Sequence, residues 1–402
     1  MLFKESIKRF TPPKGWSWAS IGDVAKLSFS SVDKKSVEGE NAVRLCNYMD
    51  VFYNRRIREG MPFMVSTASE SDIKKFTLNK GDVVLTKDSE TPEEIAFAAV
   101  IDEQIDNLVC GYHLAVLRPD KAKVTGEYLM SAINFHPNHH QFIRLANGAT
   151  RFGLGIDSLN NALLPIPPLA EQRKIAEILR TWDDAIETAQ AELKAKQERK
   201  RWLTRKFFSP SLMSAGVENT KIEWPKRPLG ELTEVLDGKR KPISKEFRKP
   251  GPFPYYGACG VVDYIDAHLF DEPLVLVGED GAKWGAGEST AFIVNGKCWV
   301  NNHAHVLRPN RDVIMDYWMM SWLNFRDLGE YVSGLTVPKL NQANLRAILI
   351  PVPPLVQQRK FVEVLQASDV DIEALSNRIV SLRAQKRGLM QKLLTGEVRV
   401  AA

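Results

Sequence analysis

Positively charged side chains gather in three short stretches of this chain of 402 residues. The stretches cover residues 55–58, 194–206 and 239–249, whereas the formal net charge of the whole chain is only +5. Clustered lysine and arginine side chains can neutralise the phosphates of a nucleic acid, and they can also form an ordinary solvated surface. The uneven distribution is therefore more informative than the total charge, and both interpretations stay open for each cluster.

Residues 278–283 place two acids and a lysine directly after an apolar run, as in the last part of some nuclease sites. Hydrolysis at such a site would need a further carboxylate at the right place. The alternative is a glycine-rich turn that presents Lys283 to DNA, and the Lys87-Asp88 pair has the same two interpretations. We expect no catalytic residue in this chain.

The cysteines and the motifs argue against metal and cofactor sites. Four cysteines stand far apart with no CxxC pair, which disfavours both a zinc site and a disulfide framework and favours buried, reduced thiols. The sequence contains no GxxxxGK[ST] phosphate loop and no Asn/Asp-Pro-Pro-aromatic motif of an amino-methyltransferase. We therefore expect no metal ligand and no cofactor bound by this chain.

Length and hydropathy predict a protein of two or three globular domains. Hydrophobic residues make up 44% and charged residues 26% of the chain, close to globular averages. No run of about 18 apolar residues suggests a membrane span, and the first ten residues lack the apolar core of a secretory signal. We expect a cytoplasmic protein with no membrane partner.

The chain repeats itself, and the repeat determines the predicted architecture. Residues 165–179 read PIPPLAEQRKIAEIL and residues 351–365 read PVPPLVQQRKFVEVL, with nine of fifteen positions identical at an offset of 186. Upstream, HLAVLRP at 113–119 resembles HAHVLRP at 303–309. Chance is a poor explanation for two such matches in the same order.

Between these matches the two halves differ. Residues 30–75 and 238–262 show no convincing similarity, so we expect a shared scaffold with different loops. Short apolar runs bounded by turn residues, such as GDVVLT and LVLVGE, predict strands in each half. The segments around Tyr128 and Tyr317 predict one short helix each. Each half is therefore predicted to be an α+β domain.

A long helix is predicted after each Pro-rich segment. Apolar residues three and four apart continue over 175–207 and 361–393 as heptad seams. A helix of about 40 residues rises about 60 Å, too far to be buried by one small domain, so we expect the two helices to pair antiparallel. Lys200 and Lys386 interrupt the two seams at equivalent places and are expected to reach the edge of the helix pair.

The doubled motif resembles one known family, the specificity subunits of type I restriction-modification systems. The motif covers residues 147–150, 163–169 and 171–175, and it recurs at residues 333–336, 351–355 and 358–360. In that family such a run closes a target recognition domain and opens a conserved spacer helix. The resemblance covers nearly the whole chain. One departure is Gln357, where the first copy and the usual family pattern have glutamate, here Glu171.

The resemblance implies an α+β fold with two pseudo-repeated α/β target recognition domains, separated by a pair of long antiparallel coiled-coil helices. The implied boundaries are 1–165 for target recognition domain 1, 166–209 for spacer helix 1, 210–351 for target recognition domain 2, and 352–402 for spacer helix 2. Duplex DNA presents equivalent grooves about every 34 Å, so two domains at a fixed separation could read two half-sites.

The resemblance also implies the partners. A subunit of this family would bind double-stranded DNA at a bipartite, asymmetric site with a spacer gap, dock two modification (methyltransferase) subunits, and allow restriction subunits to join. S-adenosylmethionine would be held by the modification subunits, and ATP and Mg²⁺ by the restriction subunits. This chain would be a non-catalytic recognition subunit.

Reading bases requires planar donors and acceptors on rigid loops, whereas phosphate contacts require only charge and backbone amides. Our candidates for DNA binding in the first domain are Arg55, Arg56, Lys74, Lys75, Lys87 and Arg151. Those in the second domain are Lys239, Arg240, Lys241, Tyr255, Tyr256, Lys283, Lys339 and, as an apolar wedge, Trp284. For Tyr255 and Tyr256 the alternative is a place in the core, since aromatic residues in a short strand are usually buried.

A second surface is predicted on the helix pair. The candidates for docking the modification subunits are positions off the seam that repeat in both copies, namely Gln172, Arg173, Lys174, Glu177, Gln358, Arg359, Lys360 and Glu363. The alternative is that this repetition merely preserves the start of each helix. For the whole protein, the alternatives to a DNA-specificity subunit are a coiled-coil scaffold that does not bind DNA and a stand-alone nuclease.

Overall fold

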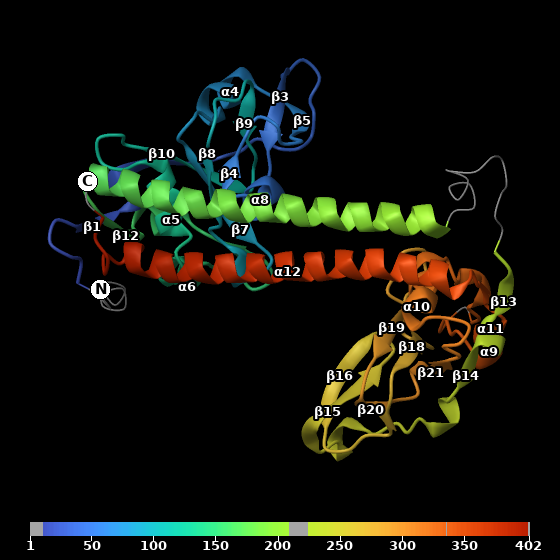
Figure 1. Cartoon of the computed structure of the whole chain (residues 1–402). Coiled ribbons are helices and arrows are strands. Elements are labelled where there is room, and N and C mark those ends of the chain that lie inside the picture. Colours follow the sequence, from blue (N-terminus) through green and yellow to red (C-terminus); the bar gives the residue numbers. More distant parts are fainter. Residues whose placement is uncertain (1–10, 209–223, 335, 401–402) are drawn as a thin grey trace. The chain divides into compact units, whose positions relative to one another are not determined.

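The computed structural model describes residues 11–208, 224–334 and 336–400. The chain folds into two compact units. The first unit combines both ends of the chain, Met1–Ala189 with Arg378–Ala402, and the second comprises Gln190–Asn377. Figure 1 labels most of the helices and strands of each unit.

A five-stranded sheet forms the centre of the first unit, in the order β2-β10-β6-β8-β4. Its strands are β2 (Ala25–Phe29), β10 (Leu114–Pro119), β6 (Val83–Thr86), β8 (Ala98–Ile101) and β4 (Arg56–Ile57). All pairs are antiparallel except β4 with β8. Because side chains alternate along a strand, Val83 and Leu85 enter one apolar cluster while Val84 enters another on the opposite face. Both faces of this sheet are therefore covered.

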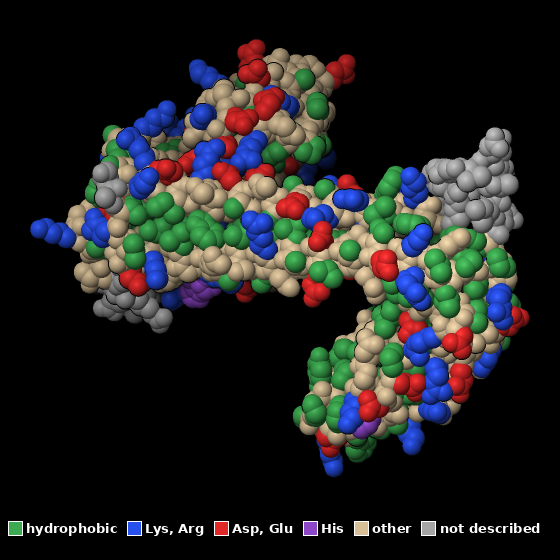
Figure 2. Space-filling view, in the orientation of Figure 1, with side chains coloured by type: hydrophobic (Ala, Val, Ile, Leu, Met, Phe, Trp, Pro, Cys, Tyr) green, Lys and Arg blue, Asp and Glu red, His purple; other side chains and the backbone are tan. Residues whose placement is uncertain are grey.

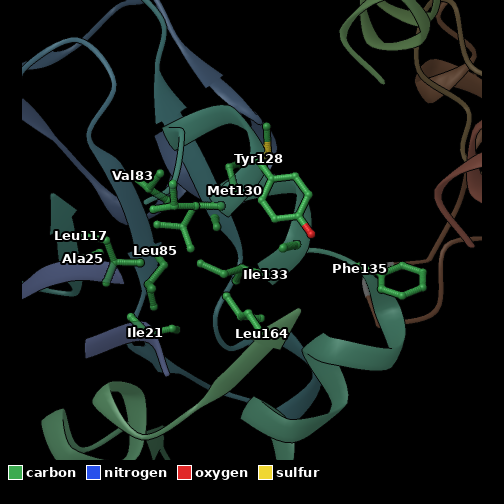
Figure 3. Packing of buried hydrophobic residues seen from close by; sticks show 14 of the residues in the cluster. Ile21, Ala25, Val83, Leu85, Leu117, Tyr128, Met130, Ile133, Phe135 and Leu164 are labelled. Atoms are coloured by element: carbon green, nitrogen blue, oxygen red, sulfur yellow. The ribbon is translucent and has the colours of Figure 1, made fainter. Parts of the chain in front are cut away.

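One face of this sheet is covered by the helices α2 (Ile21–Val24), α5 (Gly126–Ile133), α6 (His136–Leu145) and α7 (Ile156–Asn160). The other face is covered by a smaller sheet together with the helices α3 (Tyr48–Tyr53) and α4 (Glu70–Phe76). The smaller sheet has the order β5 (Met64–Ala68), β3 (Asn41–Cys46), β9 (Leu108–Cys110). Figure 3 shows Tyr128, Met130 and Ile133 of α5 on the helix side of the core, together with side chains of β6 and β10. Two short pairs complete the unit: β1 (Ser17–Ser20) with β12 (Leu163–Ile166), and β7 (Asp88–Ser89) with β11 (Phe152–Gly153).

The second unit has two four-stranded sheets. The main sheet has the order β14 (Thr233–Val235), β21 (Ala304–Pro309), β18 (Leu274–Gly278), β19 (Ala291–Val294). The other has the order β16 (Gly260–Ile265), β15 (Pro250–Gly257), β20 (Lys297–Val300), β17 (Phe270–Asp271). The remaining elements are β13 (Lys226–Pro228), which pairs with β22 (Leu349–Pro351), and the helices α9 (Leu229–Leu232), α10 (Asp316–Phe325) and α11 (Gln342–Ala347).

The two main sheets share one topology, which confirms the predicted repeat. In the first, Val84 of β6 lies opposite Val116 of β10, and in the second Leu276 of β18 lies opposite Val306 of β21. The order of four strands around these pairs is the same in both units. The two halves of the chain therefore build the same scaffold twice.

The segments without sequence similarity also contain equivalent strands. Strand β3 pairs in parallel with β9 in the first unit, and β15 pairs in parallel with β20 in the second. Both pairs join a strand of the divergent segment to the strand that directly precedes the main-sheet strand β10 or β21. The expectation that these segments are only loops is wrong, because each contributes strands to a second sheet.

Each long helix contributes to both units. Helix α8 spans Leu169–Phe208 and α12 spans Leu355–Leu394. In the first unit Ile175 and Leu179 of α8 share a cluster with Met390 and Leu393 of α12. In the second unit Phe207 of α8 packs edge-on against Phe361 of α12, with ring centroids 5.0 Å apart. Early residues of one helix thus meet late residues of the other in each unit, which confirms the antiparallel pairing.

The lysines that interrupt the seams form equivalent ion pairs. Lys386 pairs with Asp183 in the first unit, and Lys200 pairs with Asp369 in the second. Each pair joins one helix to the other, and both partners recur at the offset of 186. The expectation for Lys386 needs correction. Its side chain is only 9% exposed, so the ammonium does not reach the edge of the helix pair and is instead paired with Asp183 inside it.

The long helices begin directly after the Pro-rich segments, as predicted. Their first residues are Leu169 and Leu355, since the preceding residues form strands β12 and β22 and a pair of prolines. The predicted boundary at 209 and 210 lies outside the described residues. Within the described part of the chain, no helix combines the length and the apolar character that crossing a membrane requires.

Candidate functional site

Three loops meet beside the main sheet of the first unit, and we call them the first loop cluster. They are residues 87–90, 111–113 and 147–153. The backbone N–H of Lys87 donates to the carbonyl of His113 at 3.1 Å, and the carbonyl of Lys87 accepts from the N–H of Leu154 at 2.9 Å. The short pair β7–β11 adds further hydrogen bonds between the first and third loops. These bonds make the cluster one rigid surface.

The second unit has the same arrangement, which we call the second loop cluster. Its loops are residues 279–282, 301–303 and 333–339. The N–H of Glu279 donates to the carbonyl of His303 at 2.8 Å, and the carbonyl of Glu279 accepts from the N–H of Leu340 at 2.8 Å. Two backbone bonds at equivalent positions therefore hold both clusters, although the side chains that they carry differ.

A glycine makes the tight turn of the third loop possible in each cluster. Gly148 has φ of +143° and Gly334 has φ of +94°, values that other residues rarely adopt. A Cβ at Gly148 would lie 1.8 Å from the carbonyl oxygen of Arg151, and one at Gly334 would lie 2.5 Å from that of Val337. The turns expose the side chains of Arg151 and Val337.

An aspartate and a histidine meet at the centre of each cluster. In the first, Nδ1 of His113 lies 3.1 Å from Oδ2 of Asp88. In the second, Nδ1 of His303 lies 2.5 Å from Oδ1 of Asp280. A lysine ammonium approaches the same carboxylate in both clusters: Lys87 at 2.6 Å in the first and, less closely, a lysine of the third loop at 3.9 Å in the second.

An aromatic groove adjoins the first loop cluster and encloses about 390 Å³. One wall is helix α3, from which Tyr53 is 72% exposed and Met49 54% exposed. Arg151 and His113 line the groove together with the carboxylates Asp88, Glu90 and Glu94. Burial, with the nearby acids, raises the pKa of Tyr48 in this groove to about 12, so its phenol remains a neutral donor. Flat apolar rings beside donors and acceptors suit contact with nucleobases.

A buried polar network supports the second loop cluster. His305 approaches Asp237 at 2.6 Å and Glu279 at 3.8 Å, and the three side chains lie close enough to suggest a metal site. Arg240 occupies that space, however, because its guanidinium lies 2.5 Å from Glu279 and 3.5 Å from Asp237. Burial would raise the pKa of both carboxyls, but hydrogen bonds from His305 to Asp237 and from Arg240 to Glu279 hold both pKa values below their usual range. The arginine thus takes the place that a cation would need.

The predicted DNA-binding residues of the first unit divide into two groups. Arg55, Lys74, Lys75 and Arg151 are exposed, and of these Arg151 belongs to the first loop cluster. Arg56 is wrongly predicted as a surface contact, because its side chain is 7% exposed and pairs with Asp184 of α8 at 3.2 Å. Lys87 is also mostly buried, over the rings of Phe29 and Tyr112, so it can act on DNA only through the charge and geometry of the cluster.

The second unit divides in the same way. Three of the predicted residues are exposed, namely Lys239, Lys241 and Lys283. Lys339 is half-exposed and pairs with Glu279 at 2.9 Å. Tyr256 is partly buried. Tyr255 is buried, as the alternative interpretation expected, and its hydroxyl accepts from the N–H of Ile243. Trp284 is wrong as a free wedge: it packs on the core and donates to the carbonyl of Gly278 at 3.1 Å. Arg240 is likewise largely buried in the polar network.

Ion pairing explains why the basic clusters do not form one basic face. Arg58 pairs with Asp102 and with Glu187 of α8, so most of the cluster at 55–58 attaches the sheet to the helix. Figure 2 shows Lys and Arg side chains interspersed with Asp and Glu on the drawn face of both units. On this face the charges of the two signs are mixed, so no broad field of positive charge is seen there.

Two predicted docking residues are not on the surface. Gln172 and Gln358 are fully buried, and each makes three hydrogen bonds to backbone groups of its own unit. The prediction is wrong for these two, because the repeated glutamine anchors the start of a helix, which was the alternative interpretation. The other six residues are exposed and stay predictions: Arg173, Lys174, Glu177, Arg359, Lys360 and Glu363.

Neither the two histidines nor the aromatic helix α3 is among the sites predicted from the sequence. A signal for His113 and His303 was present, since both open the repeated heptapeptides HLAVLRP and HAHVLRP. We interpreted that match only as scaffold. No comparable signal marked Tyr53 or Met49, because α3 lies in a segment without similarity between the halves.

Comparisons with known proteins agree with this geometry. The family model described as type I restriction modification DNA specificity domain matches residues 13–197 and 221–382. A Haemophilus influenzae protein named as a type I restriction enzyme specificity subunit is 32% identical over 151 residues, which is 38% of each chain, so the match spans well under half of that relative.

Two further proteins match over nearly their whole length. A type I restriction enzyme specificity subunit of Methanocaldococcus jannaschii is 23% identical over 428 residues, covering 96% of this chain and 94% of its own. The crystal structure of the type I restriction-modification S subunit from M. genitalium superposes with a TM-score of 0.65 at 17% identity, covering 96% of this chain and 98% of that chain. Since the family model matches both halves of the chain, this protein belongs to the family of type I restriction-modification DNA specificity subunits.

Proposed function

We propose that this chain recognises a bipartite, asymmetric DNA site with a spacer gap, one half-site per unit, and directs methyltransferase and restriction subunits to it. The observation that carries the proposal is the pair of loop clusters: the same backbone bonds hold both, and the side chains on them differ. A scaffold built twice with different reading groups gives two different half-sites, which makes the whole site asymmetric.

The proposed partners are two modification subunits and, joining them, restriction subunits. The exposed residues Arg173, Lys174 and Glu177 of α8, and Arg359, Lys360 and Glu363 of α12, form equivalent surfaces in the two units. Two equivalent surfaces suit two copies of one partner. The chain would act in the cytoplasm, where such partners meet DNA.

Catalysis lies with the partners in this family of recognition subunits, and we assign the cofactors accordingly. S-adenosylmethionine would be bound by the modification subunits, and ATP and Mg²⁺ by the restriction subunits. The contribution of this chain is to position the DNA, through contacts that fix register and contacts that select bases.

The test is methylation-sensitive long-read sequencing of a host that expresses this chain with its modification partner, compared with the partner alone. We expect a split, asymmetric motif that is methylated only when both proteins are present. Exchange of residues 279–282 and 333–339 for those of a relative should then change one half-site only. A host with no new methylated motif, despite an assembled complex, would contradict the proposal.

A further inference from the structure

An aspartate–histidine pair is a side-chain arrangement that the described residues of both loop clusters share. Asp88 and Asp280 stand four residues after the opposed positions Val84 and Leu276, so they are structurally equivalent. The two histidines stand three residues before the opposed partners on β10 and β21. Most neighbouring side chains in the clusters differ between the units, yet this contact is kept.

The lysines that approach the two carboxylates come from different places in the chain. Lys87 directly precedes Asp88, whereas Lys339 belongs to the third loop of the second cluster, where the first cluster has Gly153. The same three groups, ammonium, carboxylate and imidazole, are thus assembled in two ways. This agreement argues that the arrangement serves a common role and is not a by-product of one sequence.

The carboxylate determines what each imidazole can offer to a ligand. An ionised carboxylate has only acceptor atoms, so Nδ1 of the ring must donate to it. In a neutral imidazole the other nitrogen, Nε2, then carries a lone pair and accepts hydrogen bonds. The aspartate therefore fixes both the tautomer and the orientation of the ring.

The accepting nitrogen is available in both units. The side chain of His113 is 38% exposed and that of His303 is 50% exposed. Among the hydrogen bonds of the described residues, none involves Nε2 of either ring. An oriented acceptor without a protein partner, on a rigid loop, is what direct readout of a base edge requires.

We infer that His113 and His303 are specificity-determining residues, and that Nε2 of each accepts a hydrogen bond from the exocyclic amino group of one base in its half-site. This inference rests on the proposed function and goes beyond it by naming one reading group in each unit. The amino group is N6 of adenine or N4 of cytosine, which are the amino donors on the major-groove edge. Asp88 and Asp280 act as positioning residues through the rings.

The first experiment compares methylated motifs. The chain carries His113→Ala or His303→Ala, and His136→Ala, an exposed histidine outside the clusters, is the matched control. We expect His113→Ala to relax one base position in one half-site and His303→Ala to relax one position in the other, with the gap unchanged. The control should leave the motif as it is.

The second experiment identifies the amino group. At each relaxed position, synthetic duplexes carry purine in place of adenine or 2-pyrimidinone in place of cytosine, each of which lacks the amino group. The parent complex should bind one of the two analogue duplexes about tenfold more weakly than the natural duplex, as expected for one lost hydrogen bond. The matching alanine variant should bind the natural and analogue duplexes equally.

The outcomes separate the inference from the proposed function. If the variants assemble and methylate the parent motif without any relaxed position, the inference is overturned while the DNA-specificity role stands. A different outcome is the loss of all methylation in a folded, assembled alanine variant. If the matching His113→Asn or His303→Asn variant also loses all methylation, the histidine has a structural role and the inference is overturned as well. A parent complex that methylates no split motif would instead contradict the proposed function itself.

Discussion

Gly148 and Gly334 are single residues on which the shape of the reading surface depends. Each turn brings its own ends together through two backbone hydrogen bonds, from Asn147 to Gly153 and from Ser333 to Lys339. The positive φ of the glycine, and not the identity of the exposed side chains, sets the path between these ends. A substitution at the glycine should therefore displace the side chains that the turn exposes.

We predict that Gly148→Ala weakens binding of the first half-site by at least about tenfold, since an L residue in this conformation is strained by roughly 1–3 kcal/mol and the added Cβ forces the backbone of Arg151 to move. Binding would be measured on duplexes in which either half-site is scrambled. Gly60→Ala is the control, because a Cβ there meets no atom within 4 Å. Equal losses at both half-sites would contradict the modular reading surface.

The buried Lys386 predicts a dependence of stability on pH. Burial, with the nearby Arg55, lowers the pKa of Lys386 from 10.5 to about 8 in the folded chain. Between these two pH values the unfolded chain binds more protons than the folded chain, so this group adds stability as the pH rises from about 8 toward 10.5. Below pH 8 the folded state must keep a charged ammonium inside the helix pair.

We predict that urea unfolding shows this difference when the parent is compared with Lys386→Met. From pH 7 to 10.5 the parent should gain, relative to the variant, at most about 3 kcal/mol in the free energy of unfolding. The control is Lys392→Met, which removes an exposed lysine of α12 and should leave the pH dependence of the free energy of unfolding as in the parent. If the difference in the free energy of unfolding between parent and variant stays constant across this range, Lys386 has the same pKa in the folded and unfolded chain.

At the residue scale, the lysine and arginine clusters could be predicted from the sequence, but the acidic side chains that pair with them could not. The cluster at 55–58 was visible in composition, yet Arg56 pairs with Asp184, which is 128 residues away in the chain. Whether a cation faces DNA or an acid of another element depends on tertiary contacts that a linear pattern does not contain. The exposed Arg151 was easier to predict, because a glycine turn next to it marks a surface loop.

At the element scale, the repeated glutamine connects each long helix to its own domain. The side-chain oxygen of Gln358 accepts from the N–H of Met315, the residue before α10, and its amide donates to the carbonyls of Val313 and Pro353. Gln172 makes the equivalent bonds in the first unit, including one from the N–H of Thr125. The start of the long helix and the start of a short helix are thus fixed by one side chain.

We predict that Gln358→Leu destabilises the second unit by about 2–4 kcal/mol, because three buried backbone groups lose their partner. Hydrogen exchange measured by mass spectrometry should show faster exchange at residues 313–318 and 355–361. Arg359→Ala, the exposed neighbour, should leave this exchange unchanged. If the first unit loosened equally, the glutamine would not act within its own unit.

Elements with a local signal were predicted well, and those that depend on pairing were not. The heptad seams gave both long helices to within a few residues of Leu169–Phe208 and Leu355–Leu394. Strands β3 and β15 carry no shared pattern, and what makes them equivalent is their parallel pairing with β9 and β20. Such pairing joins segments far apart in sequence, so similarity within one segment cannot reveal it.

At the scale of the whole molecule, the helix pair is predicted to set the gap between half-sites. Insertion of seven residues after Ala189 and seven after Asn377 keeps the antiparallel seams in register, because the two positions lie on opposite helices at the division between the units. Seven residues add about 10.5 Å of helix, close to three base pairs of duplex DNA. We therefore expect the methylated motif to keep both half-sites and to gain about three base pairs in its gap.

The matched control inserts seven residues into α8 alone, which breaks the register of the pair and should prevent assembly. A gap that stays fixed in the double insertion, with both half-sites still read, would show that the helices do not measure the distance on DNA.

The construction of the first unit from both ends of the chain has a consequence for synthesis. Ile175 and Leu179 pack in one cluster with Met390 and Leu393, and Arg399 forms an ion pair with Glu171 at 2.7 Å. On the ribosome, the 188 residues from 190 to 377 must be added between these partners, which takes roughly 10–40 s at usual elongation rates. The domain that emerges first is therefore completed only after the second unit has been synthesised, and its apolar helix face stays uncovered until Met390 and Leu393 have been added.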